Sequence, residues 1–408
     1  LQDRNRRASK DAFTVLVHRE ETLVDEPEGD QARPLDAGKP VDAQLFPDND
    51  VDLYAIDAPG PGRIRVVVTD LPGTSWIPVQ ILDADGQTVL LQAATVAPSA
   101  PLAGRHAALC WEMRAQGRCI VRIGNKEAGA RSASVRPYRI RCEFDQVALA
   151  EAGTNDSADT ATPLADGAPV EDLLFPRTDV DWYAIDVPEG DSLIAFFENP
   201  GGLSAEIRLS AAAERDTELS KTVAWPDADG YVQADGLPAG RYLIRVQNAS
   251  SSNEDRRASA LPYRIVAKTV AQAAWAEVSA PAKDKARELA LGSWQAVRFP
   301  KDQEAIWLRV AVPSAGSVRV LGASFGERPM QLALAEVDGS SGRVASPRSY
   351  VGVSRAVVKG GDVLVCLSRW SDEAEPPAVL VYADSSAVVN SATAPFATPG
   401  ATVGPLAA

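Results

Sequence analysis

Five oxygen-bearing side chains between residues 151 and 181 form the group in this sequence best suited to chemistry. Glu151, Asn155 and Asp156 precede a predicted strand, and Asp179 and Asp181 lie on the loop that enters it. Calcium takes six to eight oxygen ligands, so the group predicts a calcium site if the fold brings its two segments together. In the alternative interpretation, Asp179 and Asp181 cap a turn and the other three are solvated linker residues.

A poorer copy of this acidic group lies earlier in the chain, and a third copy is missing. The earlier copy consists of Glu26, Glu28, Asp30, Asp50 and Asp52. Further on, Ala305 and Ile306 stand where Val180 and Asp181 would be expected. Calcium binding is therefore predicted first for the middle of the chain.

Two Asp-rich strings resemble fragments of an EF-hand loop. They are Asp83–Gly86 and Asp227–Gly230, and neither is followed by the Glu that closes a twelve-residue calcium loop. We interpret both as Asp-Gly turns between strands.

An enzyme is not predicted. Gly322–Gly326 satisfies the Gly-x-Ser-x-Gly pattern of a hydrolase nucleophile elbow, but a strand-like run, Glu327–Val337, follows where a helix is required. The histidines, His18 and His106, both precede that serine, whereas the α/β-hydrolase order places the histidine last. The pattern therefore lacks the context that catalysis needs.

The elements that must position the acidic residues are repeated along the chain. Phe46–Asp57 and Phe175–Asp186 are nearly the same sequence, 175 − 46 = 129 residues apart. A weaker third copy starts at Phe299 and continues through Trp307–Pro313. A period of roughly 125 residues is far above the ~20 to 50 residues of solenoid repeats, so each unit is expected to have its own core.

Each unit also ends on strand-like runs. Gly117–Asn125, Gly240–Asn248 and Gly361–Leu367 align with one another, and a second β-rich run follows each. Short runs of this kind, split by Gly, Pro and Asp, are typical of all-β sandwiches. The one competing helical stretch is a short helix predicted around Lys283–Leu291.

The second unit resembles the bacterial pre-peptidase C-terminal domain. The residues that carry this resemblance are Glu151–Ser157, Ala161–Leu164, Asp179–Tyr183, Leu237–Tyr242 and Tyr263. The match spans nearly all of unit two, unit one keeps part of it, and unit three keeps only the hydrophobic frame.

The resemblance implies the fold and the setting. It implies a jelly-roll-like sandwich found in secreted bacterial proteins, usually appended to peptidases and related to collagen-binding domains. In that family the domain is a binding or packing module without catalytic residues, and the related collagen-binding domains bring the two acidic segments together around calcium. The expected fold is thus all-β, with three tandem jelly-roll-like antiparallel β-sandwich domains.

The repeats divide the chain into five parts. They are an N-terminal strand segment (1–19), the first sandwich (20–147), the second (148–272), a divergent third (273–386) and an Ala/Pro/Thr-rich tail (387–408). Asp11–Arg19 alternates like a strand and is either the last strand of a preceding unit or an extra edge strand of unit one. The tail has the composition of a linker that orders only against a partner surface.

Net charge and sequence composition restrict the classes of binding partner that are expected. The 408 residues carry 41 basic and 55 acidic side chains, a net charge of −14, which argues against nucleic acid and anionic membranes. The sequence contains no apolar run long enough to span a membrane. Other protein subunits, in a homo-oligomer or a larger surface assembly, are the expected partners, and the resemblance implies a secreted, periplasmic or cell-surface location. The start at Leu1, without Met, suggests a processed chain.

Cysteines leave two possibilities open. Cys110, Cys119 and Cys142 lie on neighbouring predicted strands of unit one, so either two of them pair in an oxidising compartment or all are buried thiols. Cys366 has no local mate.

Three classes of function fit these observations. The leading one is a structural or adhesive component of a bacterial extracellular or cell-surface assembly. The second is a polysaccharide- or fibrous-protein-binding module, with Trp76, Trp225 or Trp294 as an aromatic platform unless they pack in cores or between domains. The third is the accessory region of a secreted peptidase.

Overall fold

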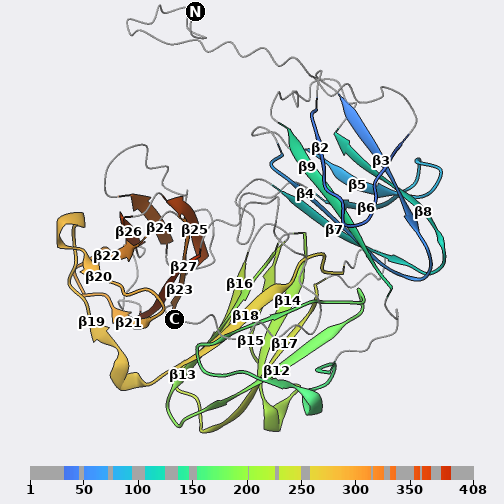
Figure 1. Cartoon of the computed structure of the whole chain (residues 1–408). Helices are drawn as coiled ribbons and strands as arrows, with labels where there is room; N and C mark the ends of the chain where they lie inside the picture. Colours follow the sequence, from blue (N-terminus) through green and yellow to red (C-terminus); the bar gives the residue numbers. More distant parts are fainter. Residues whose placement is uncertain are drawn as a thin grey trace, which may run out of the picture.

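The computed structural model describes residues 32–45, 50–71, 77–93, 106–124, 137–146, 154–200, 202–225, 229–249, 258–313, 316–325, 331–336, 353–358, 361–368 and 378–386. These residues form six sheets that pack as three successive β-sandwiches, here called domains 1, 2 and 3 (Figure 1). The prediction of three tandem jelly-roll-like sandwiches is confirmed. Asp11–Arg19 and the tail lie outside the described residues, and the exact domain boundaries stay a prediction.

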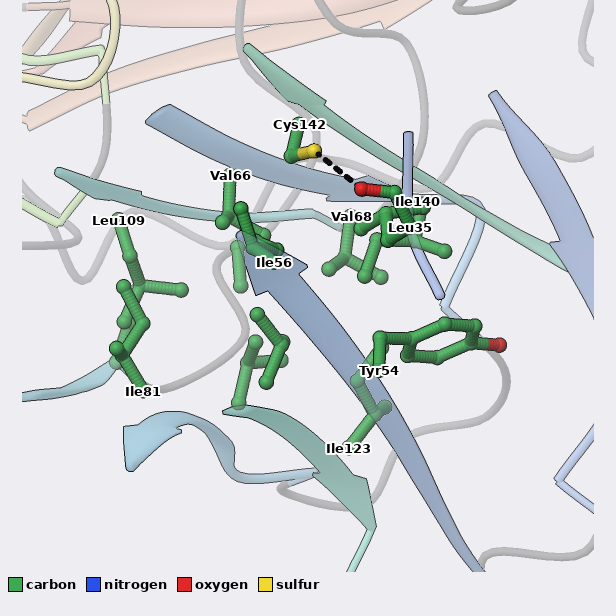
Figure 2. Packing of buried hydrophobic residues seen from close by; sticks show 14 of the residues in the cluster. Leu35, Tyr54, Ile56, Val66, Val68, Ile81, Leu109, Ile123, Ile140 and Cys142 are labelled. Carbon is green, nitrogen blue, oxygen red and sulfur yellow. Dashed lines mark hydrogen bonds between the residues drawn. The ribbon is translucent and has the colours of Figure 1, made fainter. Parts of the chain in front are cut away.

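Domain 1 is built from two facing sheets with strand orders β1-β3-β8-β5-β6 and β2-β9-β4-β7. Its strands are β1 (Arg33–Pro34), β2 (Val41–Ala43), β3 (Val51–Ala58), β4 (Gly62–Thr69), β5 (Val79–Leu82), β6 (Val89–Ala93), β7 (Ala107–Met113), β8 (Gly117–Gly124) and β9 (Tyr138–Asp145). Alternate residues of both sheets point inward. Figure 2 shows this core, in which the Cys142 thiol donates to the Leu35 carbonyl at 3.4 Å.

Domain 2 repeats the same topology, with orders β10-β12-β17-β14-β15 and β11-β18-β13-β16. Its strands are β10 (Thr162–Pro163), β11 (Pro169–Asp172), β12 (Val180–Val187), β13 (Ser192–Glu198), β14 (Ala205–Ala211), β15 (Glu218–Ala224), β16 (Gly230–Ala234), β17 (Gly240–Asn248) and β18 (Tyr263–Val270). The repeated sequence therefore encodes a repeated structure, strand by strand. In both domains the first, two-residue strand pairs in parallel, and the other pairs are antiparallel.

Domain 3 keeps the frame with changes, in orders β19-β21-β27-β23-β25 and β20-β22-β26-β24. Its strands are β19 (Ala276–Glu277), β20 (Arg287–Glu288), β21 (Trp294–Arg298), β22 (Ala305–Val312), β23 (Gly316–Ser324), β24 (Gln331–Glu336), β25 (Val353–Val358), β26 (Gly361–Ser368) and β27 (Ala378–Ser386). Nothing among the described residues occupies the place that β6 and β15 hold in the other domains.

Helical structure in the described ranges is limited to single 3-10 turns. These are η1 (Ala158–Thr160), η2 (Ala212–Glu214), η3 (Gln272–Ala274) and η4 (Lys283–Lys285). The helix predicted around Lys283–Leu291 is therefore wrong, because the chain leaves η4 and pairs Arg287 beside Leu308 of β22. No helix of the described chain is long and apolar enough to cross a membrane.

The first core strand of domain 2 behaves as alternation predicts. Tyr183 is fully buried in the domain core, whereas Trp182 lies half-buried on the opposite face beside Ala184 and Leu243. One face of β12 therefore builds the sandwich interior, and the other contacts the turns that cover the sheet.

The junction between domains 1 and 2 combines apolar and polar contacts. Its apolar cluster consists of Val67, Ala108, Cys110, Phe175, Ala258, Ala260 and Leu261. The Arg63 guanidinium lies 4.7 Å from the centre of the Phe175 ring, and Glu112 accepts the Arg177 N–H at 2.6 Å. Domain 1 therefore contacts two loops of domain 2, one with Phe175 and Arg177 and one with residues 258–261.

The junction between domains 2 and 3 is a sheet-on-sheet contact and is strongly apolar. Its fully buried members are Ile194, Phe196, Val266, Val270, Leu321, Ala323 and Leu380. The Trp294 ring of domain 3 stacks on the Phe196 ring of domain 2, with their centres 5.8 Å apart, and is tilted against the Tyr382 ring at 4.7 Å. Since large apolar interfaces suppress relative domain motion, domains 2 and 3 are expected to act as one body.

A buried ion pair crosses the same junction. The Arg319 guanidinium contacts both oxygens of Glu198 at 2.5 and 2.6 Å, and only 6% of either side chain is exposed. Arg319 also pairs with Asp384 on its own sheet. Removal of either side chain would break a buried ion pair that joins the two domains, so the pair favours this alignment of their surfaces.

We predict that Gly167→Ala loosens this junction more than its matched control, Gly190→Ala. Both glycines have positive φ, +73° and +78°, so each alanine costs about 1 to 2 kcal/mol of left-handed strain. A Cβ on Gly167 would also lie 2.8 Å from Nε1 of Trp294, whereas one on Gly190 meets nothing within 4 Å. Calorimetry should show a lower unfolding temperature for Gly167→Ala than for Gly190→Ala. Equal decreases would contradict the close contact.

Candidate functional site

A buried chain of hydroxyl and carboxyl groups lies at one end of domain 2. Asp181 and Tyr183 come from β12, Tyr263 from β18 and Asp172 from the end of β11. The Tyr263 hydroxyl and the Asp181 carboxyl lie 2.5 Å apart, the two tyrosine hydroxyls contact each other, and the Tyr183 hydroxyl donates to Asp172 at 2.9 Å. The strands bring Tyr263 together with residues about eighty positions earlier in the sequence.

The hydrogen-bonded network has more oxygen-to-oxygen contacts than its two tyrosines have hydroxyl hydrogens. Three oxygen-to-oxygen contacts need three hydrogens, and Tyr183 and Tyr263 supply two. A proton on one of the two terminal carboxyls, Asp172 or Asp181, supplies the third. The electrostatics agree, because burial, helped by the neighbouring carboxylates of Asp172 and Asp179, raises the pKa of Asp181 from 3.8 to about 9. Burial also raises the pKa of both tyrosines well above 10.

Asn155 and Asp156 extend the acidic group toward the surface. The Asn155 amide donates to Asp172 at 3.3 Å, and its backbone carbonyl accepts the Trp182 N–H at 2.8 Å. The Oδ1 atom of Asp156 is buried and has no hydrogen-bond partner among the described residues, and the Asp156 carboxylate helps raise the pKa of Asp181. A buried carboxylate oxygen without a donor is costly unless a cation or a proton compensates it.

Asp179 has a different role from Asp181. Its two carboxylate oxygens accept the backbone N–H groups of Phe175 at 2.9 Å and Val180 at 2.8 Å. Asp179 therefore caps the loop that enters β12, as the turn interpretation expected. Asp181 does not cap the turn, because its hydrogen bond goes to a tyrosine of the facing sheet.

The described part of the chain contains Asn155, Asp156, Asp179 and Asp181, but not Glu151. Within that part, no three His, Cys, Asp or Glu side chains are arranged as a ready metal-binding group. The calcium site thus stays a prediction. The donors present are amide and carboxylate oxygens, which are the type that calcium prefers.

Asp172 was missed by the sequence-based prediction, as were the two tyrosines. The repeat contained a signal for the tyrosines, because Tyr54 and Tyr138 occupy the corresponding positions of unit one. Asp172 had no such signal, since the corresponding residue is Ala43, which pairs with Tyr138 as Asp172 pairs with Tyr263.

Domain 1 contains a reduced version of the cluster. The Tyr138 hydroxyl donates to Asp52 at 2.5 Å and lies 2.7 Å from the Tyr54 hydroxyl, and Asp50 accepts the Val51 N–H at 2.8 Å. Glu26, Glu28 and Asp30 lie outside the described residues.

Domain 3 replaces the cluster with hydrocarbon. Strand pairing puts Ile306, Leu308 and Val379 where domain 2 has Asp181, Tyr183 and Tyr263, and all three are fully buried in its core. The sandwich therefore folds without this polar group. The β-sandwich fold therefore does not explain why domains 1 and 2 contain the polar group.

The remaining sequence candidates have structural explanations. Ser324 is buried within β23 and pairs with Val379, so it does not stand on a nucleophile elbow. Asp83 and Asp85 accept backbone N–H groups of the β5–β6 turn at 3.2 and 2.7 Å, as predicted for a turn.

Cysteines and tryptophans also have assigned places. All four cysteines are free thiols, and burial raises the pKa of Cys110, Cys119 and Cys142 to about 12. Trp294 packs between domains 2 and 3, Trp225 is 61% exposed, and Trp76 lies outside the described residues.

Comparisons with known proteins do not establish a family. No protein-family model matches the chain, and no curated protein matches it. Among similar solved structures, the pre-peptidase C-terminal domain of Bacillus anthracis collagenase is 13% identical, covers 26% of this chain and 94% of its own, and has a TM-score of 0.21. This likeness is too weak to establish a family, so membership in the pre-peptidase C-terminal family stays a prediction.

Two further similar structures span more of the chain. A triple jelly roll protein from an archaeal virus turret covers 83% of this chain and 82% of its own at 10% identity and a TM-score of 0.17. Tandem carbohydrate-binding modules of a Streptococcus pneumoniae family 98 glycoside hydrolase cover 57% and 84% at 8% identity and a TM-score of 0.19. At these TM-scores none of the likenesses assigns a ligand or a function.

We predict that the stability of domain 2 falls as pH rises when divalent cations are chelated. The pKa of Asp181 is about 9 when folded and 3.8 when exposed, so between these values the folded state binds one more proton. The contribution of Asp181 to the stability should be complete below about pH 4 and be lost, by roughly 1 kcal/mol per pH unit, as the pH rises toward 9. Urea unfolding at several pH values measures this slope.

The slope should disappear in Asp181→Asn, which keeps the shape but cannot lose a proton. Asp186→Asn, at an exposed position of the same strand, is the control and should keep the slope. A slope that survives in Asp181→Asn would show that another group causes it.

Proposed function

We propose that this chain is a non-catalytic structural or adhesive component of a bacterial extracellular or cell-surface assembly. Its three sandwiches would act as a pre-assembled body that contacts other protein subunits. The observation that carries the proposal is the burial of domain 2 against both neighbours, through Phe175 on one side and Phe196 on the other. A chain that fixes its domains in this way presents surfaces at defined spacings, which suits assembly more than catalysis.

Charge supports a protein partner. A net charge of −14 repels nucleic acid and anionic lipid surfaces and favours basic protein surfaces or divalent cations. We propose that the protein is secreted, periplasmic or located at the cell surface. This location rests on the resemblance to the pre-peptidase C-terminal domain.

Two alternatives have weaker support. A polysaccharide- or fibrous-protein-binding module needs an exposed aromatic platform, and Trp294 is unavailable for one because it packs against Phe196. Trp225 is exposed and remains a candidate contact. An accessory region of a secreted peptidase would need a catalytic domain elsewhere in a longer precursor, which mass spectrometry of the native protein would detect.

We further propose calcium as a structural ion of domain 2. The buried, unpaired Oδ1 of Asp156 and the carboxyl of Asp181 are the described groups that favour it, with Asn155, Asp179 and Glu151 as the other predicted ligands. A cation there would compensate the carboxylates and take the place of the Asp181 proton. It would stabilise the loop that carries Phe175 into the junction with domain 1.

We expect calcium to raise the unfolding temperature of domain 2. Saturation at one hundred times the dissociation constant stabilises a folded protein by about 2.7 kcal/mol. Asp156→Asn and Asp181→Asn should remove the effect, whereas the exposed Asp186→Asn should keep it. Differential scanning calorimetry with calcium and with chelator makes the comparison, and an unchanged unfolding temperature in the wild-type protein would contradict the site.

Deletion of Asn390–Ala408 should reduce assembly without unfolding the chain. Each sandwich has its own buried core, so loss of a terminal segment is expected to leave the three cores intact. Light scattering of the native and truncated proteins measures particle size, and circular dichroism checks the fold. Unchanged particles, or global unfolding on truncation, would each oppose this part of the proposal.

A further inference from the structure

A row of cationic side chains crosses the outer face of one sheet of domain 2. Strand pairing puts Trp182 of β12 beside Arg245 of β17. It then puts Arg245 beside Arg208 of β14, and Arg208 beside Lys221 of β15. These four side chains are partly or fully exposed, whereas Ile244, next to Arg245 in the sequence, points into the core. The three positive side chains are here called the cationic row.

The cationic row has no printed contact with another domain in the described part of the chain. The facing sheet of domain 2 is the one that packs against domain 3, through Ile194 and Phe196. On the sheet that carries the row, turns η1 and η2 cover the neighbouring residues Ala184 and Leu243 but stop there. The side chains of the row are 26% to 36% exposed, enough for a ligand to reach their charged ends.

Two carboxylates face the three cations of the row. Glu206 accepts a hydrogen bond from Arg208 at 2.6 Å and lies 2.6 Å from the Lys221 Nζ atom. Its distance to Arg245 is 3.8 Å, which is too long for a hydrogen bond. Glu218 lies 3.5 Å from Arg208. The Nε atom of Arg245 is buried without a hydrogen-bond partner among the described residues. Arg245 is therefore the cation of the row that lacks a close anion.

Arg245 is held in place without being neutralised. Its guanidinium lies 5.5 Å from the centre of the Trp182 ring, which orients the group but supplies no negative charge. Arg208 lies directly opposite Arg245, and like charges in directly opposed positions destabilise a sheet. Partial burial, together with the Arg208 cation, lowers the pKa of Arg245 below its usual value. An anion bound beside Arg245 would relieve this repulsion.

The matched row of domain 1 has no such deficit. Its four positions are occupied by Leu53, Arg122, Gln80 and Gln92. Arg122 donates to Gln80 at 2.6 Å, and the Gln80 amide donates to Gln92 at 2.6 Å. In domain 3, Cys366 stands at the position of Arg245 and pairs with Trp307. The cationic row is therefore specific to domain 2 and is not required by the sandwich frame.

A short acidic sugar suits the row better than a large anion or a protein surface. Guanidinium groups bind carboxylates through two parallel hydrogen bonds, and a uronic acid carries one carboxylate on each ring. Since adjacent strands lie about 4.8 Å apart, the three cations span roughly 10 Å, the scale of a short oligosaccharide. A large polyanion would also meet the rest of a chain whose net charge is −14. A protein interface usually has an apolar centre, which the row lacks.

We propose that the cationic row of domain 2 binds the carboxylates of a short acidic oligosaccharide, with Arg245 and Arg208 as the main contacts and Lys221 at the rim. Neighbouring polar groups, such as the Gln247 amide that donates to Glu206 at 2.8 Å, lie beside the row where sugar hydroxyls would be. The contact is made by guanidinium groups, so the site differs from an aromatic platform. This inference goes beyond the proposed protein contacts and does not depend on them.

Isothermal titration calorimetry of the full chain with trigalacturonate tests the site. Chelator is present because uronate oxygens themselves bind divalent cations. Arg245→Gln removes the charge, and its matched control is Arg122→Gln, at the same position of the repeat in domain 1. We expect the wild-type chain to bind, Arg245→Gln to bind roughly tenfold or more weakly because a charge-assisted hydrogen bond is lost, and Arg122→Gln to bind like the wild type. Lys221→Gln, at an exposed position, is a second variant and should weaken binding severalfold.

Four results would overturn the proposal. They are no binding by the wild-type chain, equal binding of the uncharged methyl ester of trigalacturonate, equal losses in Arg245→Gln and Arg122→Gln, and undiminished binding by both Arg245→Gln and Lys221→Gln. Triglutamate carries side-chain carboxylates without sugar rings. If it bound more tightly than trigalacturonate, the row would be a site for an acidic protein segment and the sugar would be rejected.

The same titration separates this inference from the proposed function. Deletion of Asn390–Ala408 should leave sugar binding unchanged, because the row lies on domain 2, which has its own core. A chain that binds trigalacturonate but forms no larger particles would support this site and oppose the proposed assembly. A chain that assembles but does not bind trigalacturonate would do the reverse.

Discussion

Strand β13 has no face in contact with water, and the arrangement of the domains depends on this fact. Leu193, Ala195 and Phe197 pack into the core of domain 2, while Ile194 and Phe196 pack against domain 3. A strand buried on both faces reads as a continuous apolar run. Because β13 belongs to both the internal core and the domain junction, the junction cannot open without exposing Phe196 and breaking the ion pair between Arg319 and Glu198.

The buried polar cluster, unlike β13, is not required by the fold. Asp181, Tyr183 and Tyr263 lie inside a sandwich whose domain 3 counterpart replaces them with Ile306, Leu308 and Val379. Since apolar side chains fill the same place, packing alone does not require hydroxyls and carboxyls there. The polar group also connects to the loop of Asp179, whose carboxylate holds the N–H of Phe175, the residue that domain 1 contacts. Chemistry at the acidic end of domain 2 and contact with domain 1 therefore share one loop.

Much of this architecture could be predicted because the sequence repeats. The strings around Tyr54 and Tyr183, with the weaker third copy, predicted the strand class and three sandwiches. Alternation predicted that Trp182 and Tyr183 lie on opposite faces, but not which of them is buried. The junctions could not be predicted, because alternation along β13 shows that both faces are apolar but does not say what covers the second. The separate roles of Asp179 and Asp181 also needed the structure. One faces backbone N–H groups and the other a tyrosine from a strand about eighty residues away, a distance in sequence at which spacing carries no information.

The three units have diverged in their surfaces more than in their frame. Domain 3 gives up the polar cluster and uses one sheet to cover domain 2, domain 2 carries charge on its edge strand, and domain 1 leaves an uncharged edge at β6. An apolar edge that served no contact would be an aggregation hazard, and one or two charged residues would remove it, as β15 shows. The chain contains that remedy in domain 2 and lacks it in domain 1. One strand order therefore tolerates different edge chemistry, because the ladder to the neighbouring strand is made by the backbone in both domains.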